Sequence, residues 1–333
     1  MLMKISFFAK VKNTDAFDRV NFYKQDIEAL KKITPDVSLA MHWHEIDWTA
    51  DVIFVWWWTY AFVPVLIGKI LRKKVIITGT FNYRPQGGVK GFYDRSFIQR
   101  MLIKFSMKYA TMNILVSRKE YDLISKDWNL PNITYSPHGI YTSVYKPAFI
   151  KRERFFFSIS WLQKTNVYRK GVMETIQAVS ILKKKYPDIL FILAGKKGDA
   201  LNDIENYIKC SNLENNIRVV GAITEKEKID YLQKCMCYVQ PSRYEGFGLA
   251  VAEAMSCGAL VLTTSAGELE NVVDKAGIII DEVTPSVIAN MMEIIYETPD
   301  IGTTMGAKAS KRIMDKYPVE SRYMSLMEII ENC

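Results

Sequence analysis

The sequence is poor in cysteine and histidine. Its 333 residues contain five cysteines and three histidines, and every cysteine lies beyond residue 200. An odd and scattered set does not form a disulfide framework and indicates reduced thiols in a cytosolic protein. Cys235 and Cys237 are one residue apart, with no second pair and no histidine nearby. Burial in a core therefore explains them better than a zinc site.

Long hydrophobic runs are also scarce. The run that approaches a membrane span in length, Val52 to Leu71, is interrupted by a proline, a glycine and a lysine. A strand through Trp56 to Trp58, a turn and a helix from Pro64 to Leu71 explain the same residues as the core of a parallel sheet. The amino terminus, MLMKISFFAK, is too short and too polar for a signal peptide and predicts a first strand.

Length and charge divide the chain into two halves. At 333 residues the chain exceeds one ordinary core, so we expect two domains. Residues 1–150 hold 21 Lys and Arg against 12 Asp and Glu, a net of +9, whereas residues 151–333 hold 23 against 24, a net of −1. A basic first half favours anionic surroundings such as phospholipid or a lipid-linked phosphate. Nucleic acid is the less favoured alternative, because no recognition helix, RNP-type aromatic pair or zinc spacing accompanies the charge.

The most informative segment is Pro241 to Gly258, PSRYEGFGLAVAEAMSCG. It predicts a loop after a buried strand, then a helix that ends at Gly258 before the next apolar strand. Such a loop lies at the carboxyl end of a parallel sheet, where the first N–H groups of the helix face the ligand. Gly246 and Gly248 remove side chains that would hold an anion away from that backbone. The segment therefore predicts a diphosphate site.

Two carboxylates, Glu245 and Glu253, flank the helix start of this segment. Helical geometry alone does not make them a close acid pair. We expect them to bind different parts of one elongated ligand, because a carboxylate accepts two hydroxyl hydrogen bonds and suits a vicinal diol.

These residues resemble a known family. Glu245 and Glu253, with Pro241-Ser242, Gly246-Phe247-Gly248 and Cys257-Gly258 around them, resemble the E-x7-E motif of family four of the retaining glycosyltransferases, which act on nucleotide-diphosphate sugars. Further segments are similar in the same order: Ala50 to Phe81, Asn113 to Ser117, Pro137 to Ile140 with Tyr145 to Pro147, Phe191 to Gly195, Val219 to Gly221 and Ala266 to Glu270.

The resemblance implies an α/β fold of the GT-B type, with two Rossmann-like doubly wound domains facing each other across a cleft. We expect an acceptor domain at residues 1–148 and a nucleotide-sugar donor domain at 149–316. A last helix at 317–333 is expected to pack back towards the first domain.

The resemblance also implies the roles of individual residues. Lys170, in Arg169-Lys170-Gly171, is expected to contact the donor phosphate and, with Glu245, to act in catalysis. Glu253 is expected on the ribose, Glu245 on the transferred sugar, and the base near Gly195 and Ala222-Ile223. The remaining donor-site candidates are Gly246 and the backbone N–H groups of Phe247, Gly248 and Leu249, together with Gly267, Glu268 and Ile223.

The sequence departs from the family in both halves. The family's G-R-L is replaced by Ser160-Trp161-Leu162, which leaves Lys164 or Arg169 to replace the missing arginine on the diphosphate. In the first half the usual glycine pair after the first strand and a histidine near Gly79 are absent. The histidines at 42, 44 and 138 are interpreted as structural.

A basic amphipathic helix is predicted at Gly91 to Tyr109. Helical spacing places Lys90, Arg100, Lys104 and Lys108 on one side and Phe92, Ile98, Leu102, Phe105 and Tyr109 on the other. We expect the apolar side to pack on the first domain. Contact with a membrane is the alternative, and both hold if the basic side lies on lipid headgroups.

The function expected is a retaining, metal-independent hexosyltransferase without a cofactor, using a UDP- or GDP-sugar and a glycan, glycolipid or lipid-linked acceptor. We expect it in the cytoplasm, at the inner face of the cell membrane, in surface-polysaccharide or glycolipid assembly, with no nucleic-acid partner. The alternatives are a sugar-nucleotide epimerase or hydrolase and a catalytically silent GT-B subunit.

Overall fold

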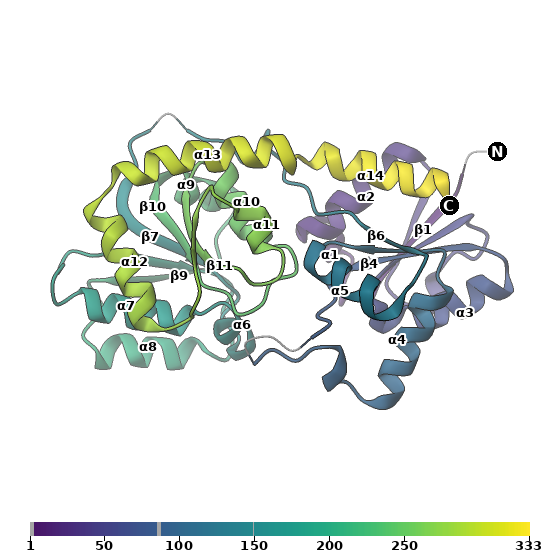
Figure 1. Ribbon diagram of the computed structural model, residues 1–333, viewed down its shortest axis with the longest axis horizontal. Helices are drawn as coiled ribbons and strands as arrows, with labels where there is room; N and C mark the ends of the chain where they lie inside the picture. Colours follow the sequence, from purple (N-terminus) through teal and green to yellow (C-terminus); the bar gives the residue numbers. More distant parts are fainter. Residues whose placement is uncertain (1–2, 85–87, 149) are drawn as a thin grey trace. The chain divides into compact units, whose positions relative to one another are not determined.

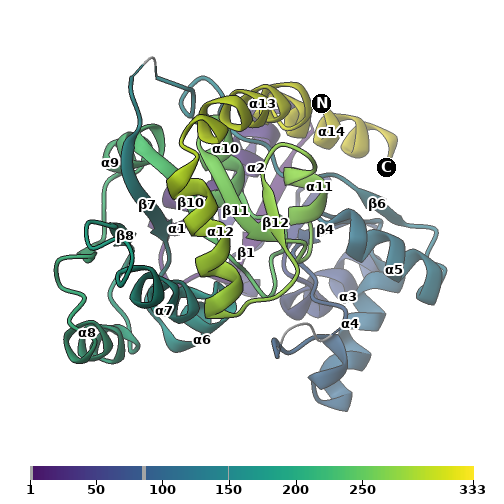
Figure 2. The same ribbon diagram turned by 60° about the vertical axis from the view of Figure 1, so that its left-hand side comes forward.

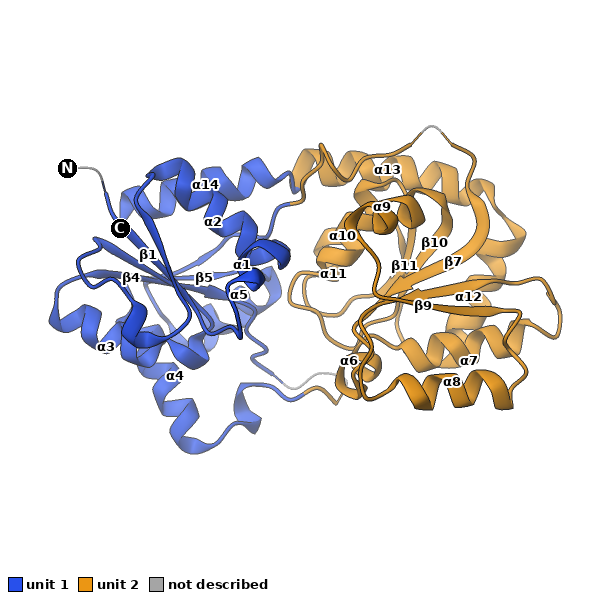
Figure 3. Cartoon of the chain, turned by 180° about the vertical axis from the view of Figure 1, so that it is seen from behind, with its two compact units in different colours: residues 1–86, 90–139, 317–333 blue, residues 87–89, 140–316 orange. Residues whose placement is uncertain are grey.

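The chain folds into two compact units. The computed structural model describes residues 3–84, 88–148 and 150–333. The first unit comprises residues 1–86, 90–139 and 317–333, and the second comprises residues 87–89 and 140–316 (Figure 3). The chain thus leaves the first unit at residue 139, before the boundary expected at 148/149. Residue 149 itself lies outside the described residues.

The first unit is built on a parallel sheet. Among the described residues, its six strands lie in the order β2-β1-β3-β4-β5-β6. Three of them, β1, β4 and β6, are labelled in Figure 1. They are β1 (Ile5–Ala9), β2 (Val37–Ala40), β3 (Val52–Trp56), β4 (Lys74–Gly79), β5 (Met112–Leu115) and β6 (Ile133–Tyr135). β1 and β3 are buried along their whole length, as continuous apolar strands between two helical layers should be.

Helices cover both faces of this sheet. They are α1 (Asp15–Arg19), α2 (Asn21–Ile33), α3 (Phe62–Ile70), α4 (Phe97–Tyr109), α5 (Arg118–Trp128) and α14 (Val319–Asn332), with short 3₁₀ turns η1 (Trp43–Glu45), η2 (Trp58–Tyr60) and η3 (Phe92–Asp94). α2 packs against α14, and α3 packs against α4. The run from Val52 is thus a strand, a turn and a helix. No helix in the described part of the chain is both long and apolar enough to span a bilayer.

A buried ion pair fixes α14 in the first unit. The Arg322 guanidinium donates to both carboxylate oxygens of Asp26 on α2, at 2.8 and 3.0 Å, and both side chains are fully buried. Arg322 also donates to the Ser136 carbonyl and to Thr78 Oγ1. The Arg322 guanidinium therefore connects α14 with α2, with β4 and with the residue that follows β6.

The second unit has its own parallel sheet. Among the described residues its six strands lie in the order β12-β11-β10-β7-β8-β9. They are β7 (Glu153–Ile159), β8 (Phe191–Ala194), β9 (Ile217–Gly221), β10 (Cys235–Gln240), β11 (Leu260–Thr264) and β12 (Ile278–Ile280). Cys235 and Cys237 are buried in β10, in agreement with the packing role predicted for them.

The helices of the second unit form two layers, seen in Figure 2. They are α6 (Lys164–Arg169), α7 (Val172–Leu182), α8 (Leu201–Cys210), α9 (Glu225–Lys234), α10 (Leu249–Ser256), α11 (Leu269–Val273), α12 (Pro285–Glu297) and α13 (Asp300–Lys316). α7 packs on α12, and α10 packs on α13. The strand, loop, helix and strand expected around Pro241 to Gly258 are β10, a loop, α10 and β11.

The packing expected for the helix near residue 100 is confirmed only in part. The helix begins at Phe97, and its buried residues are Ile103, Ser106 and Met107. Of the stripe expected to pack on the domain, Ile98 is 68% exposed, Leu102 36% and Tyr109 40%. Phe92 and Phe105 of the expected stripe do pack on the domain core, and the helix adds Ile103 and Met107, which the regular spacing did not indicate.

Candidate functional site

The candidate site lies where the strand order of the second sheet reverses. β7 comes first in the chain, β8 and β9 follow on one side of it, and β10, β11 and β12 follow on the other. At such a reversal, the segments that follow the two neighbouring strands run to opposite sides. The carboxyl ends of β7 and β10 therefore flank a crevice that suits a ligand. The segments after these two strands carry most of the predicted donor-site residues.

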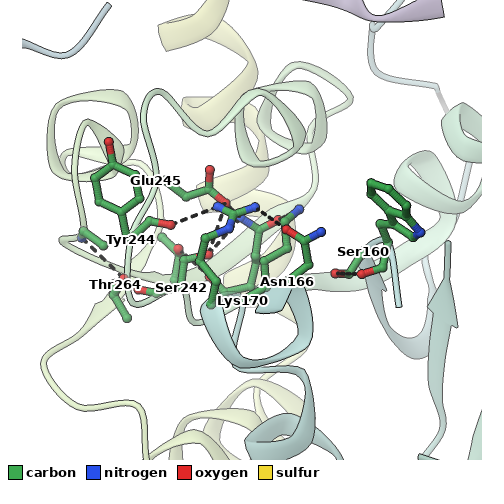
Figure 4. Close-up of polar contacts among 12 residues, drawn as sticks. Ser160, Asn166, Lys170, Ser242, Tyr244, Glu245 and Thr264 are labelled. Atoms are coloured by element: carbon green, nitrogen blue, oxygen red, sulfur yellow. Dashed lines mark hydrogen bonds and ion pairs between the residues drawn. The ribbon is translucent and has the colours of Figure 1, made fainter. Parts of the chain in front are cut away.

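Lys170 bridges the two strands at this point. It caps α6, and its Nζ donates to the Ile159 carbonyl at the end of β7, at 3.2 Å, and to Gln240 Oε1 at the end of β10, at 3.1 Å (Figure 4). Burial is the main reason that the pKa of Lys170 is lowered to about 8. The positive charge of Arg169 also lowers this pKa, whereas the negative charges of Glu245 and Glu253 raise it. An ammonium has three donors, and in the described residues two of them face uncharged acceptors.

Arg169 and Glu245 form an ion pair beside Lys170. Arg169 Nη1 lies 2.8 Å from Glu245 Oε1 and donates to the Tyr244 carbonyl at 3.0 Å. Gln240 Nε2 donates to the same carboxylate oxygen at 3.0 Å (Figure 4). The side chains of Arg169 and Glu245 are 25% and 12% exposed. Within the described part of the chain these contacts all use Oε1, so Oε2 is available to accept from a ligand hydroxyl.

Glu253 lies in a second ion pair. On α10 it is 5% exposed, and its Oε2 lies 3.1 Å from Nζ of Lys228, a residue of α9 that is 9% exposed. Burial by itself lowers the pKa of Lys228, but the charges of Glu253 and Glu225 outweigh this effect and the net pKa is raised. The sequence did not point to Lys228, because it stands in a helix with no motif of its own.

Glycines bring the loops together. Gly267 has φ +58°, and a Cβ there would lie 1.5 Å from the Glu245 carbonyl oxygen, so only glycine lets the loop after β11 touch the loop of Glu245. Gly248, with φ +93°, is the residue before α10. The backbone of Phe247, Gly248 and Leu249 thus forms the start of α10, whose first N–H groups have no partner within the helix.

Other predicted residues lie apart from this cluster or deeper in the fold. Lys164 pairs with Asp203 at 3.0 Å, and both side chains are 62% exposed. Of the two candidates for the missing arginine, Arg169 therefore lies in the cluster and Lys164 does not. Glu268 is fully buried at the start of α11. Ile223 lies half-buried in the loop after β9.

The cluster also contains residues that the sequence did not single out. Gln240 accepts from Lys170 and Tyr238 and donates to Ser242 and Glu245, so one amide orients both charges. No group of three or more His, Cys, Asp or Glu side chains in the described residues could hold a metal ion. The positive charge next to Glu245 is supplied by Lys170 and Arg169.

A known protein family matches the second unit of the chain. The model of the family "Glycosyl transferases group 1" matches residues 146–312. The gpi3 subunit of phosphatidylinositol N-acetylglucosaminyltransferase from Schizosaccharomyces pombe is 25% identical over 185 residues, which are 55% of this chain and 40% of that protein. A D-inositol 3-phosphate glycosyltransferase from Paenarthrobacter aurescens is 27% identical over 193 residues, 55% of this chain and 47% of the relative. The match thus spans less than half of either relative.

A solved structure matches along nearly the whole chain. The Anabaena protein HepE in complex with UDP and glucose superposes with a TM-score of 0.78 at 16% identity, over 99% of this chain and 100% of the other. Two Rossmann-like units with parallel sheets, matched by such structures, define the GT-B fold class of glycosyltransferases. The chain belongs to the glycosyl transferases group 1 family.

Proposed function

We propose that this protein is a retaining glycosyltransferase that moves a hexose from a UDP- or GDP-sugar to a hydroxyl of a glycan, glycolipid or lipid-linked acceptor. The observation that carries the proposal is the position of Lys170, whose ammonium joins the ends of β7 and β10 at the crevice. An ammonium, a guanidinium and a helix N-terminus at one crevice suit a diphosphate.

In the proposed reaction the donor diphosphate departs while the acceptor hydroxyl attacks from the same face of the sugar. No nucleophile of the protein is needed, because the leaving phosphate oxygen accepts the proton of the acceptor. Lys170 and Arg169 stabilise the charge that develops on the leaving group, so the proposed reaction is metal-independent and needs no cofactor. Glu245 Oε2 accepts from a hydroxyl of the sugar, and Glu253 takes the ribose by exchanging its contact with Lys228.

The first unit is the proposed acceptor side. At the carboxyl ends of β1 and β2 it has a hollow of about 360 Å³, lined by Phe8, Lys10, His42, Trp43, His44 and Tyr60. Exposed aromatic rings beside cationic groups suit a sugar or a lipid that carries phosphate. The names of the two relatives above contain phosphatidylinositol and D-inositol 3-phosphate, which supports a phosphate-bearing acceptor. The proposed setting is glycolipid or polysaccharide assembly on the cytoplasmic face of a membrane.

Thermal stabilisation by ligands tests the donor site. The purified protein is melted with UDP, GDP, ADP and their sugars, next to Lys170→Ala and Glu253→Gln. Lys164→Ala is the matched control, because it removes a lysine from the same helix outside the cluster. Ligand at about 100 times its dissociation constant should stabilise the wild type and the control by roughly 2.7 kcal/mol. We expect the shift with one base only, and we expect both site variants to lose it.

Product analysis then separates transfer from the alternatives. Proton NMR of the product should show the anomeric configuration of the donor preserved, and release of nucleoside diphosphate should require an acceptor. Release without an acceptor would instead support a hydrolase, and a changed sugar nucleotide an epimerase. If none of the nucleotides stabilises the wild type, the chain is better explained as a catalytically silent subunit.

A further inference from the structure

The first unit exposes an unusual number of apolar side chains on one helix. Of the 21 large hydrophobic side chains that are exposed in the described residues, nine lie between residues 66 and 109. Four of them form one face of α4: Phe97 and Ile98, each 68% exposed, Met101 at 54% and Leu102 at 36%. We call these four residues the α4 patch. Exposed apolar groups gathered in one place mark an interaction surface more often than apolar groups scattered singly.

The fold does not need the α4 patch. The core takes Ile103, Ser106 and Met107 of the same helix, which lie on the opposite side of the helical turn. Ser96 Oγ accepts from the Gln99 backbone N–H, so the helix start is satisfied by its own cap. Further along the exposed face, Phe105 packs on Phe62 of α3 and on Tyr109, at ring separations of 5.2 and 4.7 Å. The α4 patch therefore lies at the amino-terminal end of a helix face whose carboxyl-terminal end packs on α3 through Phe105.

Positive charge is abundant in the segment that carries the patch. Residues 66–109 contain ten Lys and Arg and a single acidic residue, Asp94. Lys69 lies 3.8 Å from the centre of the Tyr109 ring, and Lys108 lies 5.4 Å from it. Apolar and aromatic side chains bordered by lysine and arginine are the composition that binds at the headgroup level of an anionic bilayer.

We propose that the α4 patch inserts into the headgroup region of an anionic lipid bilayer and holds the first unit on the membrane. Charge complementarity favours this partner over a second copy of the chain, since two copies would set the same cluster of cations against itself. The surface deepens the membrane setting of the proposed function but uses none of the donor-site residues. Lipid binding and donor binding therefore succeed or fail separately.

Vesicle sedimentation tests the proposal. The full chain is pelleted with vesicles of phosphatidylcholine alone and of phosphatidylcholine with phosphatidylglycerol. The patch variant is Phe97→Ser/Ile98→Ser/Met101→Ser. The control, Ile181→Ser/Ile294→Ser/Met314→Ser, removes three side chains of the second unit that are 47%, 46% and 48% exposed. We expect binding to the anionic vesicles, at least tenfold weaker in the patch variant and unchanged in the control.

A charge variant and a labelled variant sharpen the test. Arg95→Gln/Lys104→Gln/Lys108→Gln should weaken binding by about fivefold for each charge removed at low salt. Phe97→Trp should show more quenching by lipids with brominated chains than the parent protein does. Nucleotide stabilisation should persist in every one of these variants, which shows that they fold.

Two results would overturn the proposal. One is equal sedimentation of the patch variant and the control with anionic vesicles. The other is a dimer of the wild type, seen by light scattering, that the patch variant converts to a monomer while neither protein binds vesicles; the patch would then be an interface between copies of the chain.

Discussion

The two units share an architecture but differ at the carboxyl edges of their sheets. In the second unit, Glu245 and Glu253 each have a cation within about 3 Å, and Lys170 joins two strands. The corresponding edge of the first unit presents the rings of Trp43 and Tyr60, which are 44% and 38% exposed. In the proposed function, the fixed charges suit the diphosphate of the donor, and the aromatic hollow suits the acceptor. Four predictions test this difference between the two units.

Arg322→Ala should have the largest effect and should act on the first unit. It leaves Asp26 buried without a counter-charge, which costs about 3 to 5 kcal/mol of unfolding free energy. Calorimetry should show the loss, and hydrogen exchange should localise it to residues of the first unit. The double variant Arg322→Met/Asp26→Leu should recover most of it. Equal protection of the first unit in Arg322→Ala and the wild type would contradict the role of the pair.

Glu120→Gln should make the unfolding free energy of the first unit less dependent on pH. Burial raises the pKa of Glu120 to about 7; its Oε2 accepts from the Tyr83 N–H, and its Oε1 has no hydrogen-bond partner in the described residues. A raised pKa means that the fold prefers the protonated acid. This stability is present below the ordinary pKa of 4.5 and is lost as the pH rises through 7.

The measurement for Glu120 is denaturant unfolding of wild type and variant from pH 5 to pH 8. The variant should gain stability relative to the wild type as the pH rises, approaching roughly 3 kcal/mol at pH 8. If the difference in unfolding free energy between variant and wild type stays constant from pH 5 to pH 8, Glu120 is not the group that titrates.

Donor affinity should depend on the proton of Lys170. The pKa of about 8 means that the free protein loses this charge just above neutrality, and a bound diphosphate favours the charged form and raises the pKa. Titration calorimetry of the nucleoside diphosphate should therefore show Kd rising about tenfold per pH unit above pH 8, with a proton taken up on binding. Lys170→Arg should flatten the profile, because arginine keeps its charge. A wild-type Kd that stays level to pH 9.5 would contradict the assignment.

Trp43→Ala should have the smallest effect and should be confined to the acceptor. The indole donates to the Tyr60 carbonyl at 3.0 Å and presents a fixed ring to the hollow. Its loss should raise the acceptor KM about five- to tenfold, with kcat and the donor KM little changed. Trp161→Ala removes an indole of the second unit that is 45% exposed and should leave the acceptor KM unaltered. If the two variants behave alike, the hollow is not an acceptor site.

The elements of the fold that could be predicted from the sequence are those fixed by apolar spacing and by glycines. The strand before Pro241, the helix from Leu249 and the strand to Thr264 follow from apolar runs and glycines. Side-chain partners that come from another element were not predictable in this way. Lys228 reaches Glu253 only because α9 packs beside α10, and Gln240 orients Lys170 only because β7 and β10 are neighbours. The packing of α4 was predicted only in part for a similar reason, since the core takes Ile103 and Met107 besides Phe105 of the expected stripe.

The return of α14 also bears on the order in which the units are made. During translation, residues 140–316 are complete before residues 317–333 leave the ribosome, so the second unit has all of its chain while the first still lacks Arg322. Domains usually fold in the order of synthesis. Here the first unit has to keep Asp26 uncovered until Arg322 has been made, which happens only after every residue of the second unit.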